Sequence, residues 1–304
     1  MICRNFLFME DILIRPDLQD SFLYIPRKED NLDGDIRTLS IVIPAYNEEN
    51  TIISILNRIT RVHLINDIQK EIIVVNDCSL DNTDKYVREY MDSNPELNIR
   101  YLSHPVNQGK GAAIHSGIRM ATGDCLIVQD ADLEYDPREY NTLLKPMVEG
   151  HADVVFGTRF YGGKPHRILF FWHSVGNKLL TFFSNLFTGL NLTDMETCYK
   201  LFHIDVIRDL PLAERRFGFE PEITARVARI PGIRIYEVGI SYYGRTFEEG
   251  KKIGLKDGFR ALYCILKYKF IGNGTRYNAN LTARSRAHHL AVPQRNEGVK
   301  PMDV

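Results

Sequence analysis

Short runs of β-branched and other apolar residues recur along the first half of the chain, and they limit the possible folds more than any other feature. The runs span Leu39–Ile43, Glu71–Val75, Ile99–Leu102, Cys125–Val128 and Asp153–Phe156. Between the first two, apolar residues from Thr51 to Ile59 are spaced three and four positions apart, which is typical of a helix. Continuous apolar strands that alternate with helices predict an α/β fold, with a mostly parallel mixed sheet flanked by helices in a single domain.

The composition agrees with a soluble globular protein. The chain has 304 residues, of which 44% are hydrophobic and 25% charged, so it is long enough to bury a sizeable core. Its formal net charge of −1 argues against nucleic acid as a partner. The cysteines are scattered and form no CxxC pair, which indicates a reducing compartment and buried thiols. They are Cys3, Cys78, Cys125, Cys198 and Cys264.

The ends of the chain differ from the region between them. We expect residues 1–37, which are rich in acids, to form a leader on the surface, and residues 38–245 to form the main domain. Residues 246–270 read as a basic amphipathic segment, and residues 271–304, which lack periodicity, as a flexible tail. No signal peptide and no run of about 18 apolar residues is recognisable, so we expect a cytoplasmic protein without a spanning helix.

Polar residues follow three of the predicted strands. They lie in Pro44–Glu49, Asn76–Asp81 and Gln129–Asp132. Ligands of parallel sheets bind at the carboxyl ends of the strands, so these three segments predict a binding site at one edge of the sheet.

The acids after the fourth run predict a metal site. Asp130, Asp132 and Glu134 are spaced by two residues, and hard oxygen ligands of this kind suit Mg²⁺ or Mn²⁺. The alternative is that they cap a helix or face solvent. A metal held by so few carboxylates usually shares a diphosphate ligand, and Arg159, Lys200, Arg245, Lys251 and Lys252 are candidate cations near it.

The segment Asn107–Ala113 has the glycines of a phosphate loop without its GxxxxGK[ST] spacing, which argues against an ATPase. Its glycines more plausibly let the following helix approach the sheet, with Lys110 near a nucleotide or the acids. No G-x-G-x-x-G follows the first strand, which weighs against a dinucleotide-dependent dehydrogenase.

Several segments together resemble the family 2 glycosyltransferases, in order and in spacing. They are LSIVIPAYNEENTI, IIVVNDCSLDNTD, NQGKGAAIHSGIRMATGDCLIVQDADLEYDP and DVVFGTRF. The resemblance covers roughly residues 38–270 and is strongest to the dolichyl-phosphate mannose synthases and the polyprenyl-phosphate glycosyltransferases. It implies a GT-A fold, which is a nucleotide-diphospho-sugar transferase fold.

The resemblance also implies roles for individual residues. Asp130 and Asp132 would bind the metal and diphosphate, together with Glu134, which stands where mannose synthases commonly have Gln. Arg159 would meet phosphate, and Arg245 resembles the arginine of the branch's R-x-x-G-x-S-K loop, although here the gap is longer and a lysine replaces the serine. The implied nucleotide-sugar site comprises Pro44, Ala45, Tyr46, Glu48, Asp77, Lys110, Asp130, Ala131, Lys200 and Lys252.

The expected reaction is an inverting transfer of one hexose from GDP-mannose or UDP-glucose to polyprenyl phosphate. A phosphate acceptor has a second pKa of about 6 and arrives largely ionised, so it needs no base. A hydroxyl acceptor needs one, and Asp194, Glu196 and Glu220 are the candidates, although Asp194 can instead orient Arg159 or Lys200. The absence of a QxxRW motif favours a non-processive enzyme with a phosphate acceptor.

Two segments predict peripheral contact with an anionic membrane, at its cytoplasmic face. One has apolar residues at helical spacing: Phe171, Trp172, Val175, Leu179, Phe182, Phe183 and Leu186. The other has a basic row and an apolar row: Lys252, Lys256 and Arg260, and Leu255, Phe259, Leu262 and Leu266. The alternative is that the apolar residues belong to the core and the lysines are merely solvated.

Two other functions remain open on the sequence. One is the same enzyme fold acting on a soluble saccharide or protein acceptor. The other is a non-catalytic module that binds a nucleotide-sugar.

Overall fold

The computed structural model describes residues 36–161, 163–165, 167, 171–245 and 255–270. The predicted leader and tail, apart from residues 36 and 37, lie outside these residues, as do Lys251 and Lys252. The boundaries proposed for them therefore stay predictions.

A seven-stranded mixed sheet forms the centre of the molecule, in the order β3-β2-β1-β4-β6-β5-β7. The strands are β1 (Thr38–Ala45), β2 (Gln69–Asn76), β3 (Ile99–Ser103), β4 (Cys125–Val128), β5 (Val154–Thr158), β6 (Lys200–His203) and β7 (Ile235–Gly239). All neighbours pair in parallel except β6, which is antiparallel to both β4 and β5. The predicted α/β fold with a mostly parallel mixed sheet is confirmed.

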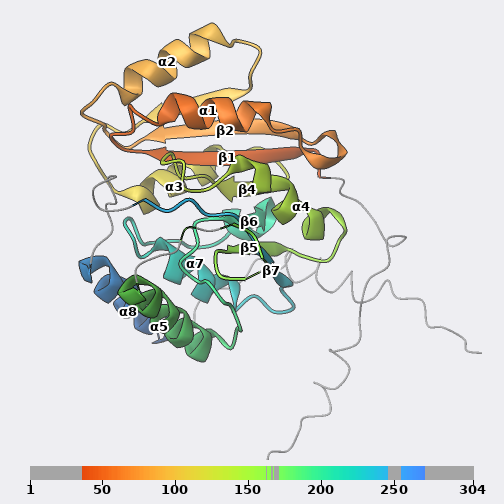
Figure 1. Cartoon of the computed structure of the whole chain (residues 1–304), viewed down its shortest axis with the longest axis vertical. Helices are drawn as coiled ribbons and strands as arrows, with labels where there is room; N and C mark the ends of the chain where they lie inside the picture. Colours follow the sequence, from red (N-terminus) through yellow and green to blue (C-terminus); the bar gives the residue numbers. More distant parts are fainter. Residues whose placement is uncertain (1–35, 162, 166, 168–170, 246–254, 271–304) are drawn as a thin grey trace, which may run out of the picture.

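The helices flank this sheet (Figure 1). They are α1 (Ile52–Arg61), α2 (Thr83–Ser93), α3 (Lys110–Met120), α4 (Tyr140–Val148), α5 (Phe171–Thr188), α6 (Ile204–Arg208), α7 (Phe219–Val227) and α8 (Leu255–Phe270), with short 3₁₀ turns at Ile65–Asp67 and Pro137–Glu139. Gly117 lets α3 pack closely on β1, since a Cβ there would lie 2.2 Å from a methyl carbon of Val42. No helix in the described part of the chain is both long and apolar enough to cross a membrane.

The five predicted strands all exist, and the side chains of four of them, β1, β2, β4 and β5, contribute to the core, whereas β3 is half-buried. Every residue of β4 is buried, and so are the central residues of β1 and β2. β1 pairs with β2 up to Ala45 and Asn76, and β4 ends opposite Val42. The segments that follow β1, β2 and β4 therefore emerge at the same edge of the sheet.

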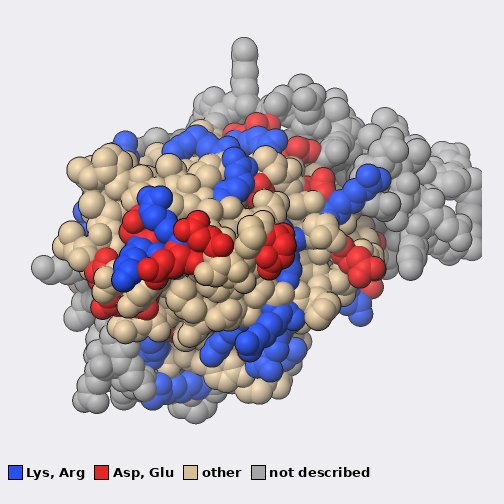
Figure 2. All heavy atoms as spheres, turned by 90° about the horizontal axis from the view of Figure 1, so that it is seen from above, with Lys and Arg blue, Asp and Glu red and all other residues tan. Residues whose placement is uncertain are grey.

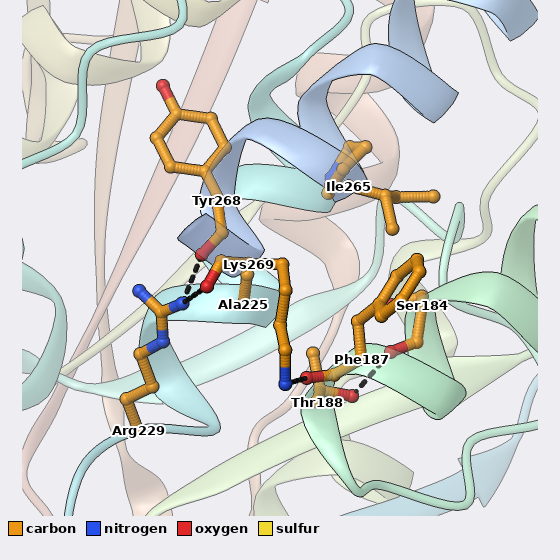
Figure 3. Close-up of a pocket in the computed structure, with 9 residues that line it drawn as sticks. Ser184, Phe187, Thr188, Ala225, Arg229, Ile265, Tyr268 and Lys269 are labelled. Atoms are coloured by element: carbon orange, nitrogen blue, oxygen red, sulfur yellow. Dashed lines mark hydrogen bonds between the residues drawn. The ribbon is translucent and has the colours of Figure 1, made fainter. Parts of the chain in front are cut away.

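Three helices, α5, α7 and α8, contact one another at the end of the molecule opposite α2 (Figure 1). Figure 3 shows the small pocket where they meet, and its polar groups are already bonded to one another. Arg229 donates to the carbonyls of Tyr268 and Lys269, and Lys269 Nζ donates to the carbonyl of Phe187 at 3.3 Å. These bonds fix the last turn of α8 to α5 and to the segment after α7.

The outward faces of α5 and α8 are apolar. On α5 the exposed residues include Phe171, Val175, Leu179, Phe182 and Leu186, and on α8 Phe259, Tyr263, Leu266 and Phe270. We call these nine residues the apolar platform. The alternative that these α5 residues belong to the core is wrong, because α5 instead buries Asn177, Thr181 and Ser184.

The described cysteines are free thiols. Cys125, Cys198 and Cys264 are buried as expected, whereas Cys78 is half-buried. On the face shown in Figure 2, acidic and basic side chains lie side by side.

Candidate active site

The loops at the carboxyl ends of the strands contain strained backbone. Among the described non-glycine residues, five have positive φ, and three of these follow β1, β2 and β4: Asn47 (53°), Cys78 (60°) and Leu133 (65°). Such conformations are uncommon outside glycine and concentrate at functional sites. Asn47 and Cys78 lie within two of the three segments that the sequence marked as a binding edge, and Leu133 directly follows the third.

Lys110, the first residue of α3, faces the acids. Its Nζ lies 2.9 Å from an oxygen of Asp130 and 3.4 Å from an oxygen of Glu220. Burial opposes the charge of Lys110, but the charges of Asp130, Cys198 and Glu220 together outweigh burial and hold the pKa of Lys110 well above its ordinary value. The lysine is therefore a fixed cation beside the DxD acids.

The glycines around Lys110 do not serve the purpose expected of them. A Cβ on Gly109, whose φ is +99°, would lie 2.5 Å from the carbonyl oxygen of Arg215, and a Cβ on Gly111 would lie 2.3 Å from that of Glu214. They therefore allow the segment before α7 to approach, not the sheet. The expectation that they serve the approach of α3 to the sheet is wrong, since Gly117 does that.

Arg245 holds the other two acids. Its guanidinium lies 2.6 Å from Asp132 Oδ2 and 3.3 Å from Glu134 Oε1, and its backbone N–H donates to Glu134 at 2.8 Å. Tyr242 donates its hydroxyl to the other oxygen of Glu134 at 2.8 Å. Although Arg245 opposes the effect, burial and the neighbouring charges of Asp130 and Glu134 raise the pKa of Asp132 to about 7.

This carboxylate group fits a divalent cation by its chemistry. Burial first, and then the charges of Asp130 and Glu134, disfavour the ionised form of Asp132, and oxygen ligands of this kind suit Mg²⁺ or Mn²⁺. Among the residues described, however, no three His, Cys, Asp or Glu side chains converge as a metal site. The set of Asp130, Asp132 and Glu134 as joint ligands stays a prediction.

Asp77, at the end of β2, lies in a second part of the site. It is 2% exposed, and its backbone N–H donates to the carbonyl of Ala45 at 2.8 Å. Its carboxylate accepts from the backbone N–H groups of Gln108 (2.9 Å) and Gly109 (2.6 Å) and is 2.8 Å from His104 Nδ1.

The remaining residues predicted to hold the nucleoside follow β1 or end it. Pro44 is half-buried, Ala45 is buried, and Tyr46 is 38% exposed. Glu48 accepts from the hydroxyl of Thr51 at 2.8 Å. The strand ends thus bring Pro44, Ala45 and Asp77 to one edge, as the sequence predicts.

Arg159 is buried in a bidentate ion pair with Asp194. Its Nε and Nη2 each lie 2.7 Å from a carboxylate oxygen, and Asn177 on α5 bonds both partners. Burial opposes ionisation of Asp194, but Arg159 outweighs it and lowers the pKa of that carboxyl. The interpretation that Asp194 orients Arg159 is confirmed as a contact. The guanidinium also lies 5.1 Å from the ring of Tyr242, which bonds Glu134.

Lys200 and Ala131 are buried within the fold. Lys200 donates to the carbonyls of Met195 (2.9 Å) and Thr197, and burial lowers its pKa. Its bonds therefore brace the loop before β6, and a role for Lys200 in binding the nucleotide-sugar stays a prediction. Ala131, between the two acids, is 3% exposed.

Glu196 differs from the other two candidate bases. Asp194 is paired with Arg159, and Glu220 faces Lys110, whereas Glu196 Oε1 is buried with no hydrogen-bond partner among the residues described. Burial, followed by the charge of Glu220, raises the pKa of Glu196 to about 8.

Sequence reasoning missed two residues of the site, His104 and Tyr242. His104 follows β3 in the segment YLSHP, so the rule that selected the other strand ends could have found it. Tyr242 stands three residues before Arg245, and no pattern in the sequence connects it to Glu134.

The chain is similar to known proteins in sequence and in fold. Residues 40–210 match the profile of Glycosyl transferase family 2. The undecaprenyl-phosphate mannosyltransferase of Micrococcus luteus is 31% identical over 230 residues, covering 72% of this chain and 88% of that protein. The dodecaprenyl-phosphate galacturonate synthase of Rhizobium johnstonii is 26% identical, covering 79% and 68%. Among solved structures, the glucosyl-3-phosphoglycerate synthase of Mycobacterium tuberculosis, crystallised with Mn²⁺ and UDP, has a TM-score of 0.58 at 21% identity, covering 78% and 82%.

Proposed function

Because the chain belongs to glycosyl transferase family 2 and has the GT-A fold, we propose that it transfers one hexose from a nucleotide-sugar to polyprenyl phosphate, with inversion at the anomeric carbon. Both curated relatives described above carry names of polyprenyl-phosphate sugar transferases, which supports this acceptor. The donor is GDP-mannose or UDP-glucose.

The observation that carries the proposal is the acidic group after β4 with a cation on each side. Asp130 faces Lys110, and Asp132 faces Arg245 at 2.6 Å. Asp130 and Asp132 would hold Mg²⁺ or Mn²⁺ together with the donor, and Lys110 and Arg245 would contact its diphosphate. The metal supplies charge neutralisation for the departing nucleoside diphosphate.

The protein's own part in the reaction is to position and to stabilise charge. Arg245 and Lys110 stabilise the negative charge that develops on the leaving group. The acceptor phosphate is already ionised near neutral pH and attacks without a base. Asp194 is therefore not needed as a base, and it holds Arg159 in place. We propose that Arg159, through its contact with the ring of Tyr242, positions the acidic group that binds the diphosphate.

We propose that the apolar platform rests on the membrane that carries the acceptor. A helix that turns Asn177, Thr181 and Ser184 inward and phenylalanines outward suits an apolar neighbour better than water. The basic row contributes less than the sequence suggested, since Arg260 lies 2.5 Å from Glu214 and is partly neutralised. The enzyme is then peripheral at the cytoplasmic face of that membrane.

Transfer of radiolabelled sugar tests the proposal. GDP-mannose and UDP-glucose are supplied separately with polyprenyl phosphate in detergent, with and without Mn²⁺. Label in the lipid extract with one donor, only in the presence of metal, is the expected result. Metal-dependent hydrolysis of the donor without labelled lipid would reject the lipid acceptor, and donor binding without turnover on any acceptor would reject the enzyme.

A hydroxyl acceptor is the second candidate, and Glu196 is the observation that favours it. Glu196 is a buried carboxyl with a free oxygen, and its pKa of about 8 makes its ionised form a stronger base than an ordinary carboxylate. Glu196→Gln separates the two candidates. With a phosphate acceptor the variant keeps its kcat, whereas with a hydroxyl acceptor kcat falls by roughly 100-fold or more while the donor still binds.

A further inference from the structure

Three polar side chains lie one helical turn apart on one side of α5, and we call them the polar row. They are Asn177, Thr181 and Asn185. Asn177 is 7% exposed and Thr181 is 4% exposed, while Asn185 is half-buried. A spacing of four residues places all three on the same side of the helix. Buried polar side chains need hydrogen-bond partners inside the protein, and these partners indicate the role of the row.

Two of these residues bond the backbone of the loop around Asp194. The hydroxyl of Thr181 accepts from the N–H of Met195 at 3.2 Å. Asn185 accepts from the N–H of Leu192 at 3.1 Å and donates to the carbonyl of the same residue at 2.8 Å. The loop is therefore attached to α5 on both sides of Asp194.

Asn177 bonds both partners of the buried ion pair. Its amide nitrogen donates to Asp194 Oδ1 at 3.3 Å, and its amide oxygen accepts from Arg159 Nη2 at 3.4 Å. The charges of the pair fix this orientation, since the opposite one would turn a donor to the arginine and an acceptor to the carboxylate. Both bonds are long, so they contribute more to the orientation of the pair than to its strength. An amide can serve an acceptor and a donor at once, which an ionised carboxylate or an ammonium group cannot do.

The loop determines where the guanidinium of Arg159 lies. Asp194 accepts from Nε and from Nη2 of this arginine at 2.7 Å, and from its backbone N–H at 3.1 Å. The guanidinium lies 5.1 Å from the ring of Tyr242, whose hydroxyl donates to Glu134 at 2.8 Å. A displacement of the loop therefore reaches the acidic group after β4 through Arg159 and Tyr242.

We infer that the polar row makes α5 a positioning element of the active site, which holds Asp194 and Arg159 where the acidic group can bind a nucleoside diphosphate. This inference rests on the proposed function and adds to it residues that touch no substrate. Every hydrogen bond that the side chains of the row make within the described part of the chain goes to this loop or to this ion pair. The other side of the same helix carries five residues of the apolar platform, so one helix connects the proposed membrane contact to the site.

Two substitutions at Thr181 test the inference. Thr181→Val has nearly the same shape and removes the acceptor of the Met195 N–H, whereas Thr181→Ser keeps this acceptor. Calorimetric titration of the full-length protein with UDP and with GDP, in excess Mg²⁺, measures the affinity for whichever nucleotide wild type binds more tightly. Thr181→Val is expected to bind that nucleotide roughly 10-fold more weakly, because the loop and Arg159 lose their fixed position, and Thr181→Ser is expected to stay within about 2-fold of wild type.

Thr188→Val is the matched control. Thr188 lies on the same helix, but its hydroxyl bonds the carbonyl of Ser184 at 2.7 Å and the N–H of Leu190 at 3.4 Å, and not the loop around Asp194. It is expected to keep the affinity of wild type even where its melting temperature falls, so thermal unfolding of each variant separates a loss of stability from a loss of position. Wild-type affinity in a folded Thr181→Val protein, or an equal loss in Thr188→Val, overturns the inference.

Asn177→Leu decides the question if Thr181→Val does not fold. It removes both bonds of the amide but leaves Asp194 and Arg159 paired with each other, so no buried charge loses its partner. The variant is expected to bind the nucleotide roughly 10-fold more weakly than wild type. An affinity equal to that of wild type overturns the inference.

Sugar transfer by the same proteins separates this inference from the proposed function. Weaker nucleotide binding in the variants, with no transfer from wild type to polyprenyl phosphate, supports the inference and rejects the lipid acceptor. Equal transfer to polyprenyl phosphate by wild type and by Thr181→Val overturns the inference and keeps the enzyme. A wild-type protein that binds neither nucleotide rejects both.

Discussion

At the scale of single residues, Asp132 shows most clearly how its neighbours oppose one another in their effect on its ionisation. Burial and two neighbouring acids favour its neutral form, while Arg245 favours the charged one. A carboxylate kept under such repulsion has more to gain from a divalent cation than from any group already present.

Asp132→Asn is therefore expected to lower metal-dependent turnover by roughly 100-fold or more, since the amide removes one charge from the metal site. The fold is expected to persist because the amide has the same shape and removes repulsion. Turnover with titrated Mn²⁺ measures the first effect, and circular dichroism the second.

The control for this substitution is Asp92→Asn on α2, an exposed position away from the site. It is expected to leave both measurements unchanged. Normal turnover in Asp132→Asn would remove the metal from the reaction.

The sequence predicted residue types at this scale better than it predicted their partners. The acids after Val128 and the polar strand ends follow from the rule for parallel sheets, and they do lie at one edge. The sequence did not show which cation pairs with which acid. Lys110 pairs with Asp130, and Arg245 pairs with Asp132, which lies more than a hundred residues before it in the chain. Lys200 shows the opposite outcome, since a lysine chosen as a phosphate contact is buried against backbone carbonyls.

At the scale of elements, α8 depends on one buried carboxylate. Glu214 is 3% exposed and accepts from Arg260, Lys267 and Tyr268, all on α8. Burial alone would raise its pKa, but these donors outweigh burial and lower it to about 2. The backbone of the same segment lies against Gly109 and Gly111, so Glu214 connects α8 to the start of α3.

Glu214→Gln is expected to lower the free energy of unfolding by about 1–3 kcal/mol at pH 7, because the amide loses the ionic part of these bonds. A carboxyl whose pKa is lowered by folding stabilises the protein above its unfolded pKa, and the contribution is lost as pH falls from about 5 toward 2. Urea unfolding at pH 7 and at lower pH measures this effect. The difference in the free energy of unfolding between variant and wild type is expected to decrease as the pH falls.

Glu89→Gln is the matched control, since Glu89 forms only an exposed pair with Lys85 at 3.8 Å. Its effect is expected to stay below about 0.5 kcal/mol. Equal stability of Glu214→Gln and wild type at pH 7 would contradict the assignment.

Strands were predictable from sequence where they contain a run of apolar or β-branched residues. β1, β2, β4 and β5 have such runs and are largely buried, and β3 was also found although it is a half-buried edge strand. β7 reads Ile-Tyr-Glu-Val-Gly and is mostly half-buried, and β6 has only four residues and runs antiparallel, so neither carries the signal of a central parallel strand. α5 was visible as a helix, but its burial of polar rather than apolar side chains depends on the loop at Asp194 and Met195 that it contacts.

At the scale of the whole molecule, the apolar platform extends over two helices that contact each other at one end of the structure (Figure 1). Phe182 on α5 is 60% exposed, and Phe259 on α8 is 74% exposed. A phenylalanine moved from water into a membrane interface contributes about 1–2 kcal/mol.

Phe182→Ser together with Phe259→Ser is therefore expected to reduce partitioning onto lipid vesicles by roughly 10-fold or more. Sedimentation with vesicles of mixed neutral and anionic lipid measures it, and nucleotide binding is expected to stay unchanged. Tyr236→Ser, which removes an aromatic ring 44% exposed on β7, is the control and is expected to partition like wild type. Partitioning of the double variant equal to wild type would contradict the proposed contact.

The inverted arrangement of α5 also bears on how the purified protein behaves. Without lipid, the exposed phenylalanines and leucines form an apolar surface that favours association, and two copies of the chain can bury this surface against each other. Dimers or larger assemblies that form in lipid-free solution and dissolve in mild detergent would then be substitutes for the bilayer. Their stoichiometry would reflect the preparation and not the working enzyme.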